Sequence, residues 1–254
     1  MERLRAWGRL IRLAMHALHC IAVCAFVFPF LGAPARMRRV GWACAKALRC
    51  LGIALHTQGA ALPGPVLLVA NHVSWLDILA VNAVRPVRFV SKADVQGWPV
   101  LGWIIACGGT LFIQRERKRD AMRVLHQVAD ALRAGDVIAV FPEGTTGDAR
   151  ALLPFHANLL QAAITTSTVV QPVALHYSDA RAPRSEAALW IGATTLMDSL
   201  WRIARADRLS ATVRMLDALP AAGLERRALV QRASAAIARA LDADVIESKP
   251  QPRA

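Results

Sequence analysis

The sequence predicts an α/β protein with a mixed central sheet flanked by helices and an N-terminal pair of helices. Short apolar runs, such as residues 66–70 and 137–141, alternate with stretches of helical periodicity, which is the pattern of strands covered by helices. The first 51 residues differ from the rest because they combine long apolar runs with basic clusters. A chain of 254 residues has room for one domain and a short appendage.

The N-terminal part has three interpretations. Residues 13–31 are almost wholly apolar and follow four arginines, which fits a cleaved signal peptide, a single spanning helix or a helix–turn–helix anchor in one leaflet. Gly32 and Pro34 break the run, and residues 35–51 form an amphipathic basic helix suited to an anionic membrane interface. We therefore expect a two-helix membrane anchor over residues 1–55. Arginines on both sides of the first helix predict an inner (cytoplasmic) membrane protein whose remaining part faces the cytoplasm.

Residues 56–246 are expected to form the α/β domain, and residues 247–254 a flexible tail. A turn-rich segment over 58–65 opens the domain. Strands are expected at 66–70, 88–90, 110–113, 137–141 and 169–175, with weaker strand patterns at 187–191 and 212–216. Helices are expected at 75–84, 119–134, 156–166 and 224–241, and Gly135 provides a helix stop.

Composition limits the classes of function. The net charge is +13 and 55% of the residues are apolar, which excludes overall disorder and favours an anionic membrane surface as partner. One Tyr and seven Phe give few aromatic platforms for base stacking, so no nucleic-acid partner is expected. The five cysteines contain no CxxC pair, which argues against a zinc knuckle or a redox motif.

His72 and Asp77 form the sharpest local signal. The run Asn-His-Val-Ser-Trp-Leu-Asp directly follows an apolar strand, and sites in α/β sheets form where strands end. If the loop folds back, Asp77 can hold one imidazole nitrogen while the other accepts a proton from a substrate hydroxyl. The spacing also fits a helix cap in which Ser74 and Asp77 only satisfy backbone N–H groups. The two roles are compatible, because a capping carboxylate is rigid.

Two further segments carry polar residues at strand ends. The run Phe-Pro-Glu-Gly-Thr-Thr-Gly-Asp begins at residue 141 and places Glu143 at a strand exit beside glycines that let backbone N–H groups face a ligand. An ordinary turn explains the same run. Arg115 ends the run Gly-Gly-Thr-Leu-Phe-Ile-Gln-Arg, and a guanidinium at a strand end can clamp a phosphate, although basic clusters are often only solvated surface.

The order of these blocks resembles the glycerophospholipid acyltransferase family, best known for the 1-acylglycerol-3-phosphate acyltransferases. Asn-His-x-Ser-x-x-Asp, Gly-x-x-Phe-Ile-x-Arg, Phe-Pro-Glu-Gly-Thr and Val-x-Pro-Val occur in the family order over about residues 60–180. The resemblance implies a catalytic general base His72, oriented by Asp77, the HX4D pair. It also implies substrate binding by the following residues: Arg115, Glu143, Gly144, Thr145 and Pro172.

The implied reaction moves an acyl chain from an acyl thioester, acyl-CoA or acyl-carrier protein, to the free hydroxyl of a lysolipid acceptor. The resemblance implies no metal and no bound redox cofactor. The acceptor expected first is 1-acylglycerol-3-phosphate, giving phosphatidic acid.

The sequence departs from the phosphatidic-acid-forming members at two positions. Those members usually have Arg where this chain has Thr146, and a basic residue where it has His156. The Thr-Thr version resembles acyltransferases for other lysolipids, including lyso-ornithine lipid. An alternative from another class is a non-catalytic membrane-surface protein, against which the complete set of polar motif residues argues.

Overall fold

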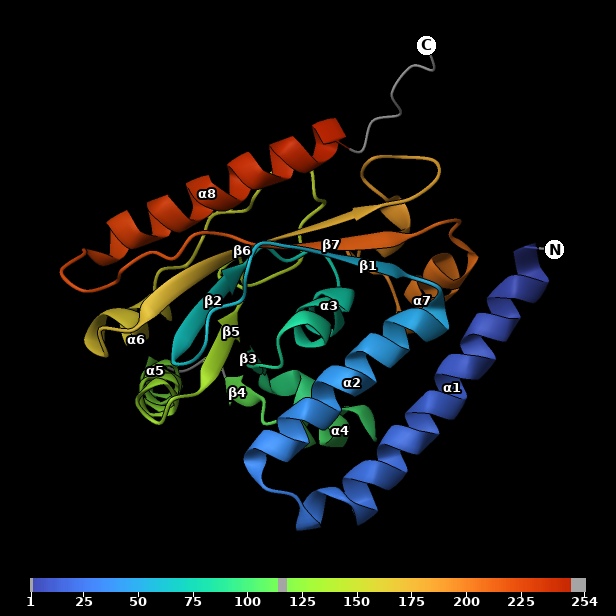
Figure 1. Ribbon diagram of the computed structural model, residues 1–254, viewed down its shortest axis with the longest axis horizontal. Coiled ribbons are helices and arrows are strands. Elements are labelled where there is room, and N and C mark those ends of the chain that lie inside the picture. The colour runs from blue at the N-terminus through green and yellow to red at the C-terminus, as the bar shows by residue number, and fades with distance from the viewer. Residues whose placement is uncertain (1, 114–117, 248–254) are drawn as a thin grey trace.

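The computed structural model describes residues 2–113 and 118–247, and it shows a seven-stranded mixed sheet between layers of helices (Figure 1). The strands are β1 (Ala54–Gln58), β2 (Val66–Ala70), β3 (Arg88–Lys92), β4 (Leu111–Ile113), β5 (Val137–Val140), β6 (Val169–Ser178) and β7 (Ser210–Met215). Their order is β1-β7-β6-β2-β5-β3-β4. Among the pairs formed by these seven strands, β6 with β7 is antiparallel and the others are parallel, so the predicted mixed sheet is confirmed.

Helices cover both faces of the sheet. The α-helices are α1 (Glu2–Phe26), α2 (Ala33–Leu51), α3 (Leu76–Val84), α4 (Leu101–Cys107), α5 (Lys118–Arg133), α6 (Leu160–Thr165), α7 (Leu196–Arg205) and α8 (Arg226–Glu247). One core cluster joins the sheet to α2, α3 and α7, and the other joins it to α5, α6 and α8. Figure 1 shows α8 along one face, α2 and α3 on the other, and α1 outside α2.

Alternation along β2 explains why it is central. Leu68 belongs to the core on the α3 side, whereas Leu67 and Val69 belong to the core on the α5 and α8 side. All five of its residues are buried, which matches the continuous apolar run of a parallel strand covered on both faces. The predicted bounds 66–70 are confirmed.

The two N-terminal helices lie against the domain. The turn between them contains a 3-10 helix (Phe28–Phe30), and Gly32 precedes α2 with Pro34 in its first turn, as the break at these residues predicts. Helix α2 buries Leu48 and Leu51 against the sheet side that carries α3. Gly41 permits this close approach, because a Cβ there would lie 2.7 Å from Cγ of Pro86.

Polar contacts fasten α1 to the end of α7. Arg9 is 8% exposed and donates to the carbonyls of Ala204 (2.9 Å) and Ala206 (2.8 Å). Its positive charge is also attracted by the negative, C-terminal end of the α7 dipole. Arg5 pairs with Asp207 at 2.9 Å. Helix α1 also exposes a row of large apolar side chains at helical spacing, of which Trp7 contacts Trp201 of α7: Leu4, Trp7, Ile11, Met15 and Leu18.

Several expectations about elements need correction. Residues 187–191 are not a strand; a short 3-10 helix (Glu186–Ala188) begins there, because the Ser185 side chain accepts from the N–H of Ala187. Strand β1 and helices α4 and α7 were not expected from the sequence. The strand β1 lies at the sheet edge and is mostly exposed, so it lacks an apolar pattern. Helix α7 begins with a capping box of Thr195 and Asp198, a signal that could have revealed it.

Candidate functional site

The site forms where β2 and β5 end, at the same edge of the sheet. Beyond the last residue of β2, the Asn71 side chain continues the pairing with β6: its amide donates to the carbonyl of Leu175 (2.9 Å) and its carbonyl accepts from the N–H of Leu175 (2.8 Å). Asn71 is 3% exposed. This clamp fixes the point at which the chain leaves the sheet, and His72 is the next residue.

His72 and Asp77 are in direct contact. Nδ1 of His72 lies 2.8 Å from Oδ2 of Asp77, so an ionised carboxylate makes Nδ1 the protonated nitrogen and leaves Nε2 as an acceptor. The Asp77 side chain is fully buried, whereas the His72 side chain retains 19% exposure. Among the described residues, nothing forms a hydrogen bond with Nε2. The predicted fold-back of the loop is therefore seen.

The Asp77 carboxylate is saturated by donors. Besides the imidazole, Oδ2 accepts the backbone N–H groups of Val73 (2.8 Å) and Ser74 (2.9 Å), and Oδ1 accepts the Tyr177 hydroxyl at 2.8 Å. Asp77 thus caps the loop before α3 and orients His72 at the same time, which is the compatibility of roles that the spacing allows. A buried carboxylate is tolerated because it is hydrogen-bonded on both oxygens.

Tyr177 is a residue that the sequence motifs missed. It is the only tyrosine in the chain, and it projects from β6 on the side that faces α3, two residues after Leu175. Burial raises the pKa of its phenol well above the usual range, and the Asp77 charge raises it further. A buried tyrosine hydroxyl needs a hydrogen-bond partner, so the position of the single tyrosine in a strand beside β2 was the sequence signal that could have indicated its contact with the site.

Aromatic packing sets the plane of the imidazole. The His72 ring stacks on the Phe141 ring with centroids 4.0 Å apart and an interplanar angle of 9°. Phe89 stacks behind Phe141 at 5.4 Å. With Asp77 on one nitrogen and Phe141 on one face, the ring has a single fixed orientation and one accessible nitrogen.

The loop after β5 holds the backbone of His72. Glu143 accepts the N–H of His72 on Oε1 (2.7 Å) and the N–H of Leu153 on Oε2 (2.9 Å), and Gly147 donates its N–H to the His72 carbonyl (2.8 Å). Glu143 is 5% exposed, and burial raises its pKa, an effect that the two backbone hydrogen bonds partly oppose. In this structure its carboxylate is engaged by the loops.

The other predicted binding residues lie at varying places around this loop. Gly144 adopts a φ of +72°, which favours glycine, and Thr145 beside it is exposed. Pro172 is buried within β6 opposite Val69, below the strand end. Arg115 lies outside the described residues. The structure thus brings His72, Asp77 and Glu143 together, places Gly144 and Thr145 on the adjoining turn, and leaves Pro172 inside the sheet.

Thr146 connects this turn to the segment after β6. Its hydroxyl donates to the carbonyl of Trp190, and the Trp190 N–H donates to the carbonyl of Val73 at 3.0 Å. The Thr146 side chain, which stands where phosphatidic-acid-forming acyltransferases usually have Arg, is therefore turned toward the segment after β6. Within residues 2–113 and 118–247, no three His, Cys, Asp or Glu side chains are grouped so that they could hold a metal.

Known proteins resemble this chain over most of its length. The acyltransferase family model matches residues 53–176, which include every motif residue named above. The chain is 37% identical over 208 residues to the lyso-ornithine lipid O-acyltransferase of Pseudomonas aeruginosa, and the matched region covers 82% of this chain and 80% of that protein. It is 39% identical over 165 residues to the 1-acyl-sn-glycerol-3-phosphate acyltransferase of Neisseria meningitidis, covering 65% and 64%.

The fold also matches a solved structure. The crystal structure of the 1-acyl-sn-glycerophosphate acyltransferase of Thermotoga maritima superimposes with a TM-score of 0.73 over 99% of this chain and 100% of that chain, at 17% identity. The expected fold class is thereby confirmed with its N-terminal helices included. The extent of the sequence match decides the family: this chain belongs to the acyltransferase family that includes the lyso-ornithine lipid and 1-acylglycerol-3-phosphate O-acyltransferases.

Proposed function

We propose that this protein is a lysolipid O-acyltransferase in which His72 is the general base and Asp77 its orienting partner. The observation that carries the proposal is the 2.8 Å contact between Nδ1 of His72 and the buried carboxylate, which leaves Nε2 to accept a proton. The serine of the motif, Ser74, is fully buried and its hydroxyl accepts the N–H of Leu76, so the substrate's own hydroxyl is the nucleophile.

The reaction then proceeds in two proton transfers. Nε2 takes the proton of the lysolipid hydroxyl as its oxygen forms a bond to the thioester carbonyl, giving a tetrahedral oxyanion. Asp77 stabilises the imidazolium. Collapse of the oxyanion breaks the carbon–sulfur bond, and the departing thiolate receives the proton from the imidazolium. The products are the acylated lipid and a free thiol, with no acyl-enzyme.

Two acceptors are candidates, and one specific observation separates them. The first is 1-acylglycerol-3-phosphate, for which Arg115 is the proposed phosphate ligand, with Glu143, Gly144, Thr145 and Pro172 around the acceptor. Thr146, however, supplies no cation and donates to the Trp190 carbonyl instead. This favours the second acceptor, lyso-ornithine lipid, on which the Pseudomonas aeruginosa relative acts by its name.

We further propose that α1 places the enzyme on the cytoplasmic face of the inner membrane. Helix α1 is long and apolar enough to cross a bilayer by length and composition. Its contacts with α2 and α7 and its buried Arg9 favour an orientation along the domain, with the exposed apolar row in the lipid. Ile11→Ser combined with Met15→Ser should move the protein from washed membranes to the soluble fraction while preserving its fold.

The test of the function measures radiolabelled acyl transfer by the detergent-solubilised full chain. Lysophosphatidic acid and lyso-ornithine lipid are each offered with acyl-CoA and with acyl-carrier protein as donor. His72→Ala should abolish transfer, whereas His126→Ala, which removes an exposed histidine of α5, should leave it unchanged. Equal transfer by His72→Ala and the parent would refute the mechanism, and no transfer to either lipid by the parent would refute the function.

A further inference from the structure

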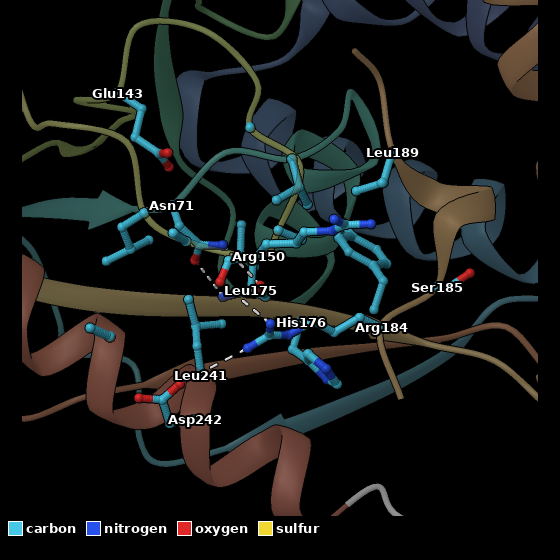
Figure 2. Close-up of a pocket in the computed structure, with 17 residues that line it drawn as sticks. Asn71, Glu143, Arg150, Leu175, His176, Arg184, Ser185, Leu189, Leu241 and Asp242 are labelled. Atoms are coloured by element: carbon cyan, nitrogen blue, oxygen red, sulfur yellow. Dashed lines mark hydrogen bonds and ion pairs between the residues drawn. The ribbon is translucent and has the colours of Figure 1, made fainter. Parts of the chain in front are cut away.

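A cavity of about 260 Å³ is lined by Asn71 and Val73, on either side of His72, and the proton transfers described above do not use it. Figure 2 shows its walls: Glu143 and Arg150 come from the loop after β5, Arg184 from the segment after β6, and Asp242 from α8. His72 is not among the described residues that line it. Tyr177 lines it and also donates to Oδ1 of Asp77, so the cavity adjoins the pair through this tyrosine.

The cavity has an excess of positive charge. Within the described part of the chain, the Arg150 guanidinium makes no hydrogen bond or ion pair. Arg184 approaches Asp242 only at 3.9 Å, and the Asp242 side chain is 78% exposed. The other carboxylate, Glu143, uses both oxygens for backbone N–H groups. Two guanidinium groups therefore face a space in which neither available carboxylate offers them close pairing.

His176 adds a buried polar atom that needs a partner. The residue is 6% exposed, and its Nε2 has no hydrogen-bond partner among the described residues, although buried polar atoms are nearly always bonded. The ring lies beside the backbone of Pro183, which has no N–H, and because Nε2 has no partner, Nδ1 is the nitrogen placed to donate to that carbonyl. Burial lowers the pKa of His176, which keeps the ring neutral. Nε2 is then the acceptor nitrogen of the neutral ring, and no described residue forms a hydrogen bond with it.

We propose that this cavity binds a small anionic group, a carboxylate or phosphate held by Arg150 and Arg184, whose neighbouring hydroxyl or ammonium donates to Nε2 of His176. Its volume lies below the roughly 300–1,000 Å³ of pockets for drug-sized ligands, which suits a headgroup and excludes a whole acyl chain. The apolar part of the wall, which includes Leu152, Leu189 and Leu241, fits the carbon skeleton of such a ligand. The ligand is either the headgroup of a lipid or a free small molecule.

The single tyrosine of the chain makes the test specific. Protein labelled with 3-fluorotyrosine carries fluorine only at Tyr177, in the cavity wall. The full chain in nonionic detergent is titrated with sn-glycerol 3-phosphate and Nα-acetylornithine as free headgroups, and with lysophosphatidic acid and lyso-ornithine lipid as lipid-borne ones. We expect a saturable change in the fluorine spectrum. Saturation by the free compounds identifies a soluble ligand, and saturation by the lipids alone identifies a lipid headgroup.

Charge-matched variants decide whether the cavity is responsible. Arg150→Gln and Arg184→Gln should each weaken binding at least tenfold, whereas Arg181→Gln, which removes an equal charge three residues from Arg184 and outside the cavity, should change it less than twofold. Because Arg150 is exposed, Arg150→Gln should fold, and it tests the proposal even if Arg184→Gln does not fold. No saturable change with any compound, or equal weakening by Arg181→Gln, would overturn the proposal.

The same titration is repeated in a His72→Ala background. Binding should persist there, because His72 is not among the residues that line the cavity. A failure of the cavity proposal is thereby distinguished from a failure of the proposed acyltransferase mechanism, which is judged by product formation alone.

Discussion

Replacement of Asp77 by asparagine tests the proposed catalytic pair, His72 and Asp77, most directly. All four groups that contact the carboxylate are donors, so the side-chain oxygen of the introduced amide must take the place of Oδ2, where it accepts from His72, Val73 and Ser74. The amide NH₂ then faces the Tyr177 hydroxyl, which can rotate to accept from it. The loop should therefore keep its shape while the negative charge is lost.

The expected loss follows from the 2.8 Å separation. A full charge pair at that distance interacts by about 6 kcal/mol at an effective dielectric constant of about 20, which bounds the stabilisation of the imidazolium. Since about 1.4 kcal/mol corresponds to a factor of ten in rate, kcat of Asp77→Asn should fall roughly 10³–10⁴-fold, with little change in KM.

The assay is steady-state acyl transfer by purified enzyme in detergent with both substrates varied. Circular dichroism and the thermal midpoint of the same preparation check the fold. A kcat within tenfold of the parent, in a variant that folds normally, would refute the idea that Asp77 stabilises a charged imidazole. The double variant with Tyr177→Phe should unfold at a lower temperature than either single variant, because its buried NH₂ has no acceptor.

Three further predictions follow from individual contacts. Tyr177→Phe leaves Oδ1 of Asp77 without a donor, so it should cost about 1–3 kcal/mol of stability in thermal unfolding and lower kcat more than it changes KM. In the parent protein, the pKa of the Tyr177 phenol is raised by folding, so the free energy of unfolding should fall as the pH rises above 10. For the same reason, tyrosinate absorbance at high pH should appear only when the protein unfolds. Glu143→Gln keeps one acceptor for two backbone N–H groups, so the thermal midpoint should drop by roughly 2–10 °C and activity should fall; an unchanged midpoint would show that the carboxylate does not hold the loops. Arg9→Met leaves two carbonyls at the end of α7 unpaired and should expose α1 to limited proteolysis, whereas Arg12→Met, whose guanidinium contacts only α1 itself among the described residues, should not.

The sequence predicted the elements whose signals are local. The run Val66–Ala70 is apolar on both faces and is a central strand, and the spacing of His72 and Asp77 is short enough for one loop to bring them together. The contacts of Tyr177 could not be predicted in this way, because they depend on the pairing of β2 with β6 across about 100 residues. Strand β1 was missed for a related reason: its pairing with β7, not an apolar pattern, makes it a strand.

Glu143 shows how a correct motif can still leave the role of a residue open. Its place at a strand exit predicts a polar group near the site, and the structure confirms that position. What the sequence does not reveal is that both of its oxygens accept backbone N–H groups from loops on either side. A carboxylate used in this way determines where His72 sits, and any contact with the acceptor has to use lone pairs that these two hydrogen bonds leave.

The burial of Asp77 connects the stability of the loop with the chemistry of the site. A fully buried carboxylate is costly unless several donors compensate it, and three of the four donors here belong to the loop and to β6 rather than to the imidazole. The charge is therefore held in place whether or not His72 is protonated, so little rearrangement is needed when the imidazolium forms. Such preorganisation is effective because the donors are already oriented before the reaction begins. It also predicts that substitutions of Asp77 and Tyr177 lower both the stability of the loop and the rate of the proposed reaction.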